Sequence, residues 1–456
     1  MSTPLKTAPN MDNRSLHLPG LLPMGLILVL LIAGCNGGGS SNTSESMPIA
    51  TTDWSRDILM TRLTIDLGNG SAIANIELAG STETTGASFE VGDLMIASVT
   101  SGGIALDFKV LGQRLDVGVP ESEVPVTLTI NYTYNVHDNF DGILQDGHTF
   151  TWPYFCSNVF PCKSSPDNGS AFELELTGLP AETEAVYAES IDADAPSYMI
   201  GWATGDYEYL DLGRTASGIQ VGVYHLPGEQ NAAAQGGQNL RAVLDWYEQT
   251  YGEYPFGSEV ASVSVAWQGG GFGGIEHHPF WHISRDSISD QSVHAHEAAH
   301  GWFGNGVRIA CWEEFVLSEG VASYLAARAL SEVGGEGLGD SIWHSYTVQL
   351  NRLQNSSENK IAWPSGCNQV DILTDGLYGI APYMKGAFFF RDIESVVGKA
   401  GLDQALRTFY TNNRGSSAGM QELLDLIESE TGYDPTLCAG LWLRSEALPA
   451  EGACRY

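Results

Sequence analysis

The sequence predicts an α+β protein with several domains, in which an antiparallel β domain precedes a mostly helical domain. The chain has 456 residues, which is enough for two or three domains of usual size. Segments such as 60–67, 124–132 and 171–177 alternate apolar with polar residues and are separated by turn-forming Gly, Asn and Asp. After about residue 235, apolar residues instead recur with a helical period.

The composition argues against a disordered chain and against a nucleic-acid-binding protein. Apolar residues make up 43% of the chain and aromatic residues 10%, which suffices for a large core. Lys and Arg number 21 against 55 Asp and Glu, so the formal net charge is −34. A surface this acidic repels phosphate backbones, and it suits a salty or extracellular medium in which ions screen the repulsion.

The first 34 residues have the features of an export signal. A weakly basic start precedes an apolar stretch, 21–33, which is too short to cross a bilayer. The run Leu-Ile-Ala-Gly-Cys that ends at Cys35 is similar to a bacterial lipobox, whose cysteine becomes the lipid-bearing N-terminus. A plain secretory signal is the alternative. Residues 35–50 are a Gly/Ser-rich tether, so we expect an exported lipoprotein held on a membrane of the bacterial cell envelope.

We place the β domain at 51–213 and the helical domain at 214–456. The helical domain opens with a helix whose apolar stripe runs through 240–247. A strand at 260–267 leads into a Gly-rich stretch, and a second helix is predicted at 315–328.

Six cysteines remain when Cys35 is set aside. An even number in an oxidising compartment predicts three disulfides. We favour sequential pairing because two of its bridges close short loops, and the third follows by elimination. Zinc binding by these cysteines is disfavoured, because no C-x-x-C pair occurs. The predicted bridges are Cys156–Cys162, Cys311–Cys367 and Cys438–Cys454.

A possible metal site is formed by the H-E-x-x-H motif at 296–300. On a helix, positions i and i+4 share a face, so His296 and His300 can bind one metal while Glu297 faces its bound water. A catalytic zinc site needs a third protein ligand, and Glu319 in the second predicted helix fills that need. A carboxylate among apolar neighbours would require a cation, whereas the alternative is an exposed glutamate. We therefore predict one zinc ion per chain.

Three further residues near the motif receive other interpretations. His294 points away from the face shared by the two ligands, so we interpret it as a surface residue or as a support for the site. Glu313 and Glu314 precede the second helix and are interpreted as first-turn acids that the helix dipole favours.

Together these residues resemble the M1 family of metallopeptidases, the aminopeptidase N-like gluzincins. The segment 296–305, HEAAHGWFGN, followed by Glu319 and Gly320, looks like the family's H-E-x-x-H-x18-E signature. The segment 273–277, GGIEH, stands where M1 enzymes carry G-A-M-E-N. Further matches, which extend the resemblance over residues 50–456, are the W-x6-E-G pattern from Trp312, the tyrosine followed by x-K-G at Tyr383, and F-P-C-x-x-x-P at 160–166.

The resemblance implies a thermolysin-like catalytic domain and a role for each matching residue. Glu297 would be the general base that deprotonates the zinc-bound water, and Tyr383 would hydrogen-bond the oxyanion. Glu276 would hold the free α-ammonium group of the substrate, and Gly273 and Gly274 would also belong to the substrate-binding site.

Two residues and the chain end depart from the family pattern. His277 replaces the Asn of G-A-M-E-N. Trp152 occupies the position, ten residues before Cys162, where the family often has a Glu or Gln that binds the amine. An indole can meet an ammonium group only through its π face. The chain ends at Tyr456, so we expect no C-terminal helical domain and a more open cleft.

We expect a zinc-dependent aminopeptidase that hydrolyses N-terminal residues from peptides. No Ser or Cys elbow motif is evident, which argues against a covalent intermediate. One alternative is a zinc metallo-endopeptidase of the same fold, which would also cleave N-blocked peptides. Another is an inactive envelope lipoprotein that binds peptides. The expected partners are peptide substrates and, through the lipid on Cys35, a membrane.

Overall fold

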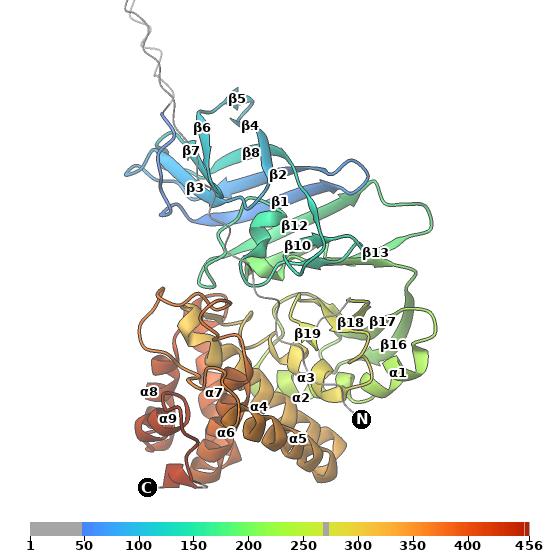
Figure 1. The fold of residues 1–456 in the computed structure, drawn as a ribbon, viewed down its shortest axis with the longest axis vertical. Coiled ribbons are helices and arrows are strands. Elements are labelled where there is room, and N and C mark those ends of the chain that lie inside the picture. Colours follow the sequence, from blue (N-terminus) through green and yellow to red (C-terminus); the bar gives the residue numbers. More distant parts are fainter. Residues whose placement is uncertain (1–47, 268–272, 451, 456) are drawn as a thin grey trace, which may run out of the picture. The chain divides into compact units, whose positions relative to one another are not determined.

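The computed structural model describes residues 48–267, 273–450 and 452–455 (Figure 1). The predicted export signal, the lipid-attachment residue Cys35 and the tether up to residue 47 lie outside these residues. Among the described helices, none is both long and apolar enough to cross a membrane.

A seven-stranded sheet dominates the N-terminal part of the chain, drawn in blue and green in Figure 1. Buried and less buried side chains alternate along its strands, so that Leu63 and Ile65 of β1 point into the core. Neighbouring strands are antiparallel except for β1 and β12, which run parallel. The spatial order is β14 (Ser190–Pro196), β12 (Gly169–Thr177), β1 (Ile58–Asp66), β2 (Ser71–Leu78), β8 (Val126–Thr133), β4 (Met95–Ser101) and β5 (Ile104–Ala105).

Smaller sheets and 3-10 turns complete the β-rich part. Their strands are short, and two of their hairpins turn through glycines with a positive φ, Gly112 and Gly147. The sheets are β3 (Gly86–Glu90), β7 (Arg114–Gly118) and β6 (Phe108–Leu111); β11 (Thr149–Phe150), β10 (Gly142–Leu144) and β9 (Val136–His137); and β13 (Glu184–Tyr187) with β15 (Trp202–Gly205). The 3-10 turns are η1 (Phe155–Asn158) and η2 (Ser197–Met199).

A five-stranded mixed sheet begins the C-terminal part of the chain. Its central strands are parallel and its two edge strands are antiparallel to their neighbours. The first edge strand crosses the expected domain boundary at 213/214, because a short turn through Gly218 joins it to the next strand as a hairpin. The order is β16 (Glu208–Arg214), β17 (Gln220–His225), β18 (Glu259–Val265), β20 (Phe280–Ser284) and β19 (Gly274–Ile275).

Helices make up most of the remaining chain, so the prediction of a β domain followed by a mostly helical domain is confirmed. The first predicted helix exists, and it ends at Tyr251 because Gly252 takes a positive φ. The helices are α1 (Gln230–Gly236), α2 (Leu240–Tyr251), α3 (Gln291–Ala299), α4 (Phe315–Gly334), α5 (Glu336–Gln354), α6 (Ile380–Val397), α7 (Lys399–Asn413), α8 (Met420–Thr431) and α9 (Thr436–Trp442). Short elements are β21 (Arg308–Ile309), β22 (Ser417–Ala418), η3 (Trp312–Glu314) and η4 (Ala453–Arg455).

Helices α4 and α6 cross through two glycines. A Cβ atom on Gly320 would lie 2.8 Å from the Cα atom of Gly386, which is closer than real Cβ atoms approach. The absence of both side chains lets the two backbones touch. Glu319 precedes the first glycine and Tyr383 lies one turn before the second, so this close crossing brings two predicted site residues together.

The six cysteines of the described chain form the three pairs that the sequence favours. The bridge from Cys311 to Cys367 spans 56 residues. It joins the residue before η3 to the long segment between α5 and α6.

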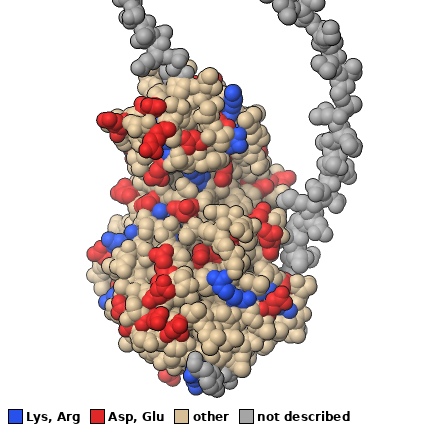
Figure 2. All heavy atoms as spheres, turned by 90° about the vertical axis from the view of Figure 1, so that its left-hand side faces the viewer, with Lys and Arg blue, Asp and Glu red and all other residues tan. Residues whose placement is uncertain are grey.

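Acidic side chains cover the molecule widely. On the face shown in Figure 2 they outnumber the basic ones and are distributed over both the β-rich and the helical parts. This agrees with the net charge of −34.

Candidate active site

Helix α3 presents the H-E-x-x-H motif. Its N-terminus is capped by the Asp290 carboxylate, which accepts the Ser292 backbone N–H at 2.9 Å. His294 is buried, so the surface interpretation of this residue is wrong. Its Nδ1 lies 2.7 Å from Ser262 Oγ and its Nε2 lies 2.9 Å from the Ile288 carbonyl oxygen. It therefore fixes α3 on β18 and leaves the opposite face of the helix for the metal site.

Three side chains converge on one point: His296 on α3, His300 directly after α3, and Glu319 on α4. His296 Nε2 lies 3.0 Å from Glu319 Oε2 and 3.2 Å from His300 Nε2, and His300 Nε2 lies 3.6 Å from the same Glu319 oxygen. Atoms bound to one tetrahedral zinc ion at about 2.0–2.1 Å are about 3.3–3.4 Å apart. The three ligand atoms thus form a triangle of the size of one face of a zinc coordination tetrahedron.

The outer ring nitrogens of both histidines are engaged, which sets their orientation. His300 Nδ1 lies 3.1 Å from the Phe303 carbonyl oxygen, so Nδ1 is a donor and Nε2 is the nitrogen that can bind a metal in the triangle. Gly304 follows with φ of 109°, and a Cβ there would lie 2.8 Å from His300 Nδ1. His296 Nδ1 lies 3.4 Å from Ser323 Oγ on α4.

The buried carboxylates of the site need a cation to balance their negative charge. Burial would lower the pKa of His300, but the carboxylates of Glu319, Glu276 and Glu297 raise it to about 10. Burial would likewise raise the pKa of Glu319, but the neighbouring histidines lower it to about 2. A buried cluster with this much negative charge and two inward imidazoles fits a divalent metal, and the donor set suits zinc.

Glu297 lies next to the ligands, under the edge of the sheet. Its side chain is buried, and burial raises its pKa well above the ordinary value, with a further rise from Glu276 and Glu319. A Cβ on Gly274 would lie 2.5 Å from Glu297 Oε1, so strand β19 passes directly against this carboxylate. The glycine at this position is therefore required by the close approach.

Glu276 follows β19 and faces the same cluster. Burial raises the pKa of its carboxyl to about 7, which His300 opposes and Glu319 reinforces. Its ligand atom and those of His300 and Glu319 all lie within 4.8 Å of one another. Asn305 Nδ2 donates to the Glu276 carbonyl oxygen at 2.8 Å and holds this backbone in place. Gly273 directly precedes β19, and its carbonyl oxygen accepts the Ser284 N–H at 2.9 Å.

Tyr383 completes the group of predicted catalytic residues. Its ring stacks on the His296 ring with centroids 5.9 Å apart. Burial raises the pKa of Tyr383 well above its ordinary value, and the Glu319 carboxylate raises it further. The phenol therefore stays protonated at neutral pH, where it can donate a hydrogen bond.

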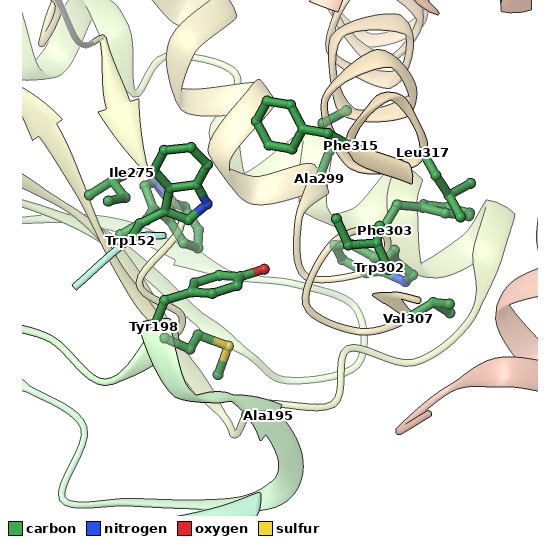
Figure 3. Close-up of a cluster of buried hydrophobic side chains, with 14 of the residues drawn as sticks. Trp152, Ala195, Tyr198, Ile275, Ala299, Trp302, Phe303, Val307, Phe315 and Leu317 are labelled. Atoms are coloured by element: carbon green, nitrogen blue, oxygen red, sulfur yellow. The ribbon is translucent and has the colours of Figure 1, made fainter. Parts of the chain in front are cut away.

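Four aromatic residues, which we call the aromatic wall, border the site: Trp152, Trp312, Phe315 and Tyr378. The sequence analysis did not single out Tyr378. Trp152 packs 4.7 Å from the Tyr378 ring and 5.6 Å from the rings of Trp312 and Phe315. Figure 3 shows Trp152 beside Phe315, which lies at the start of α4. Burial raises the pKa of Tyr378, and the charge of Glu319 raises it further. The ring centroid of Tyr378 lies 6.4 Å from that of Phe315, which in turn lies 5.9 Å from that of Tyr383. The position of Tyr378 shortly before Tyr383 was the only signal in the sequence.

His277 does not line the metal triangle. The side chain is buried, and a Cβ on Gly201 would lie 2.7 Å from its ring. Its ring centroid lies 4.9 Å from that of His282 on β20. The histidine therefore packs against residues of the sheet and the β-rich part.

Comparisons relate this chain to known peptidases. Residues 279–439 match the family model described as the peptidase family M1 domain. Leucine aminopeptidase 2 of Emericella nidulans is 26% identical over 60% of this chain and 47% of its own length. Leucine aminopeptidase 2-1 of Meyerozyma guilliermondii is 23% identical over 80% of this chain and 64% of its own length. The chain thus spans roughly half to two thirds of these curated relatives.

Solved structures show the same fold. The M1 zinc metallopeptidase from Deinococcus radiodurans aligns with a TM-score of 0.74 at 16% identity, over 87% of this chain and 95% of that chain. Leukotriene A4 hydrolase from Saccharomyces cerevisiae aligns with a TM-score of 0.73 at 20% identity, over 90% of this chain and 72% of that chain. The matched domain, the relatives and the shared fold agree with the resemblance of the motifs to peptidase family M1, and the chain contains a segment similar to the M1 peptidase domain.

Proposed function

We propose that this protein is a zinc-dependent aminopeptidase that removes N-terminal residues from peptides. The observation that carries the proposal is the triangle of His296, His300 and Glu319, whose ligand atoms lie 3.0–3.6 Å apart beside two further buried carboxylates. These three residues would hold one zinc ion per chain. A zinc ion bound there supplies a Lewis acid and lowers the pKa of a water molecule toward about 7.

Glu297 and Tyr383 supply the proton transfers and the hydrogen bond that peptide hydrolysis needs. Glu297 accepts the proton of the attacking water on its carboxylate and passes it to the nitrogen of the leaving amine. Tyr383 donates its hydroxyl proton in a hydrogen bond to the oxygen that becomes negative in the transition state.

Glu276 gives the site its preference for a free N-terminus. A buried carboxylate without a cation is costly, and the α-ammonium group of a peptide would neutralise it. The proposal is supported by the names of the fungal relatives, which are leucine aminopeptidases. It is also supported by the M1 enzyme from Deinococcus radiodurans, of which a mutant was crystallised with a bound Tyr-Ser-Ala substrate.

A metallo-endopeptidase of the same fold is the second candidate. Trp152, which is buried in the aromatic wall, stands where family members often have a second acceptor for the amine. With Glu276 as the remaining carboxylate for that group, an N-blocked peptide would lose less binding than in an enzyme with two acceptors.

The test combines metal content with a substrate panel. The zinc content of the purified protein is measured, and hydrolysis is compared between aminoacyl reporter amides and their N-acetylated counterparts. The aminopeptidase proposal expects zinc and at least about 100-fold faster hydrolysis of the free amines, which corresponds to one lost buried ion pair. Equal rates on both sets would favour the endopeptidase. A zinc-loaded protein that cleaves neither would point to a peptide-binding lipoprotein.

We further propose that the protein is exported and held on the bacterial cell envelope by lipid on Cys35. The support is the apolar stretch and the lipobox-like run in the sequence. Replacing Cys35→Ser should move the protein from the membrane fraction to the soluble fraction, and an unchanged distribution would contradict the anchor.

A further inference from the structure

We propose that Glu313 is a positioning residue that fixes one wall of the substrate site. Its carboxylate holds the segment 367–379 against η3, directly before the helix that carries the zinc ligand Glu319. That segment carries Tyr378 to the aromatic wall. The inference rests on the proposed peptidase function, because it assigns Glu313 to substrate binding in that same site.

The Glu313 side chain is fully buried and makes three hydrogen bonds to one short stretch of backbone. Its Oε2 accepts the N–H of Asn368 at 3.0 Å, and its Oε1 accepts the N–H groups of Gln369 and Val370 at 2.7 and 3.1 Å. Asn368 has φ of 59°, in the left-handed region, so the successive N–H groups turn toward the same carboxylate. Hydrogen bonds to a charged acceptor are about twice as strong as neutral ones.

The disulfide between Cys311 and Cys367 lies beside this carboxylate. Cys311 and Cys367, with Glu313, are close enough together to suggest a metal site. The two sulfur atoms are bonded to each other, however, so neither is a free thiolate ligand. The carboxylate and the disulfide therefore act on the same segment, one through hydrogen bonds and the other through a covalent bond.

The clamped segment continues to the aromatic wall. The Ile372 N–H donates to Tyr154 Oη at 3.1 Å, and the Tyr378 N–H donates to the Ile372 carbonyl oxygen at 3.0 Å. The Tyr378 ring then lies 4.7 Å from Trp152. The Tyr378 ring also lies 6.4 Å from the Phe315 ring, whose centroid is 5.9 Å from that of Tyr383 in the candidate site. Because this segment leads to Tyr378, fixing the backbone at 368–370 also fixes the position of Tyr378 in the aromatic wall.

Glu313→Gln is the informative substitution because it keeps the size of the side chain. A glutamine offers one acceptor oxygen, and its NH2 group would face backbone N–H groups that need acceptors. The segment should then open more often. Substrate binding would have to restore its order each time, which weakens binding of the substrate and of the transition state equally and therefore raises KM.

The neighbouring residue provides a matched control. Glu314 lies in the same turn, and its carboxylate accepts the Met420 N–H at the start of α8 at 2.7 Å. Glu314→Gln removes a carboxylate of the same kind one residue away, without touching the segment 367–379. Tyr154→Phe removes the second support of the segment and is a further variant should Glu313→Gln fold poorly.

The experiment measures KM and kcat on a free aminoacyl reporter amide, zinc content, and hydrogen exchange of the amides of 368–370 in the full chain. For Glu313→Gln we expect about a tenfold rise in KM, a kcat within about twofold, and full zinc content. Exchange at these amides should be at least about tenfold faster. Tyr154→Phe should shift KM and exchange in the same direction, and Glu314→Gln should shift neither.

Two results would overturn the proposal. Faster exchange with an unchanged KM would mean that the clamp is only structural, and an unchanged exchange rate would mean that the carboxylate does not hold the segment. A wild-type protein that hydrolyses no reporter would instead refute the proposed function. The hydrogen exchange of the three variants would then still report on the clamp by itself.

Discussion

Each side chain of the candidate site has a chemistry set by burial and by the charges around it. Glu297, Glu276 and Glu319 are all carboxyls in one buried cluster, yet their pKa values move in different directions. Glu319 faces two imidazoles and is held ionised, whereas the pKa values of Glu297 and Glu276 are raised chiefly by desolvation. The three glutamates are thereby suited to different roles: Glu319 to metal binding, Glu297 to proton transfer and Glu276 to binding an amine.

The general base is tested by Glu297→Gln. An amide cannot accept the proton of the attacking water, so kcat should fall by about 10²–10⁴-fold. Zinc content should stay unchanged, since Glu297 is not one of the three converging ligands. Near-normal turnover in a zinc-loaded variant would show that another group is the base.

The oxyanion donor is tested by Tyr383→Phe. Its hydrogen bond forms mainly in the transition state, so kcat should fall by about 10²–10³-fold while KM changes little. Steady-state kinetics separate the two constants. A rise in KM with kcat unchanged would instead assign Tyr383 to substrate positioning.

The amine acceptor predicts a pH dependence of KM. Above the pKa of Glu276 the carboxylate is negative and attracts the α-ammonium group; below it the carboxyl is neutral and this attraction is lost. In the metal-free site this pKa is about 7, and the positive charge of bound zinc should move it lower. KM should therefore rise as pH falls through this lowered pKa. The KM of Glu276→Gln should be high at every pH, and a parallel pH profile in that variant would refute the assignment.

At the scale of elements, the crossing of α4 and α6 holds the predicted ligand Glu319 near Tyr383. The motif on α4 predicts a helix, and the tyrosine pattern predicts another site residue. Neither pattern states that the two backbones touch. The glycines at 320 and 386 make this contact possible, because any Cβ at either position would overlap the other helix.

Gly320→Ala tests this crossing. The new Cβ would lie 2.8 Å from the Gly386 Cα, so we expect a loss of about 1–3 kcal/mol in the free energy of unfolding, and lower activity from displaced site residues. The control is Gly337→Ala on α5, where a Cβ has open space; its stability should change by no more than about 0.5 kcal/mol. Chemical denaturation measures both. Equal stability of the two variants would mean that the helices can separate at no cost.

At the scale of the whole molecule, the disulfides and the zinc site are independent supports. Each bridge restricts the unfolded chain and should contribute about 2–4 kcal/mol. Thiol reduction should therefore lower the melting temperature while zinc content stays constant, since the described ligands include no cysteine. Loss of zinc in step with reduction would place a cysteine at the metal.

Part of this organisation could be predicted from short-range pattern. Strand alternation before residue 214, the helix at 240–251 and the burial demanded of Glu319 all follow from local spacing and from the cost of an unpaired charge. The residues of the H-E-x-x-H motif all belong to one helix, so their local spacing is enough to predict which of them share a face.

The sequence by itself determined the order of β-rich and helical parts, the identity of the metal-binding residue types and the resemblance to a family. The tertiary structure alone decided that His294 is buried against Ser262, that Tyr378 packs on Trp152 in the aromatic wall, and that Glu313 binds backbone far along the chain. The reason is physical. These contacts join residues far apart in the chain, and local periodicity carries no information about which distant backbone will meet a given side chain.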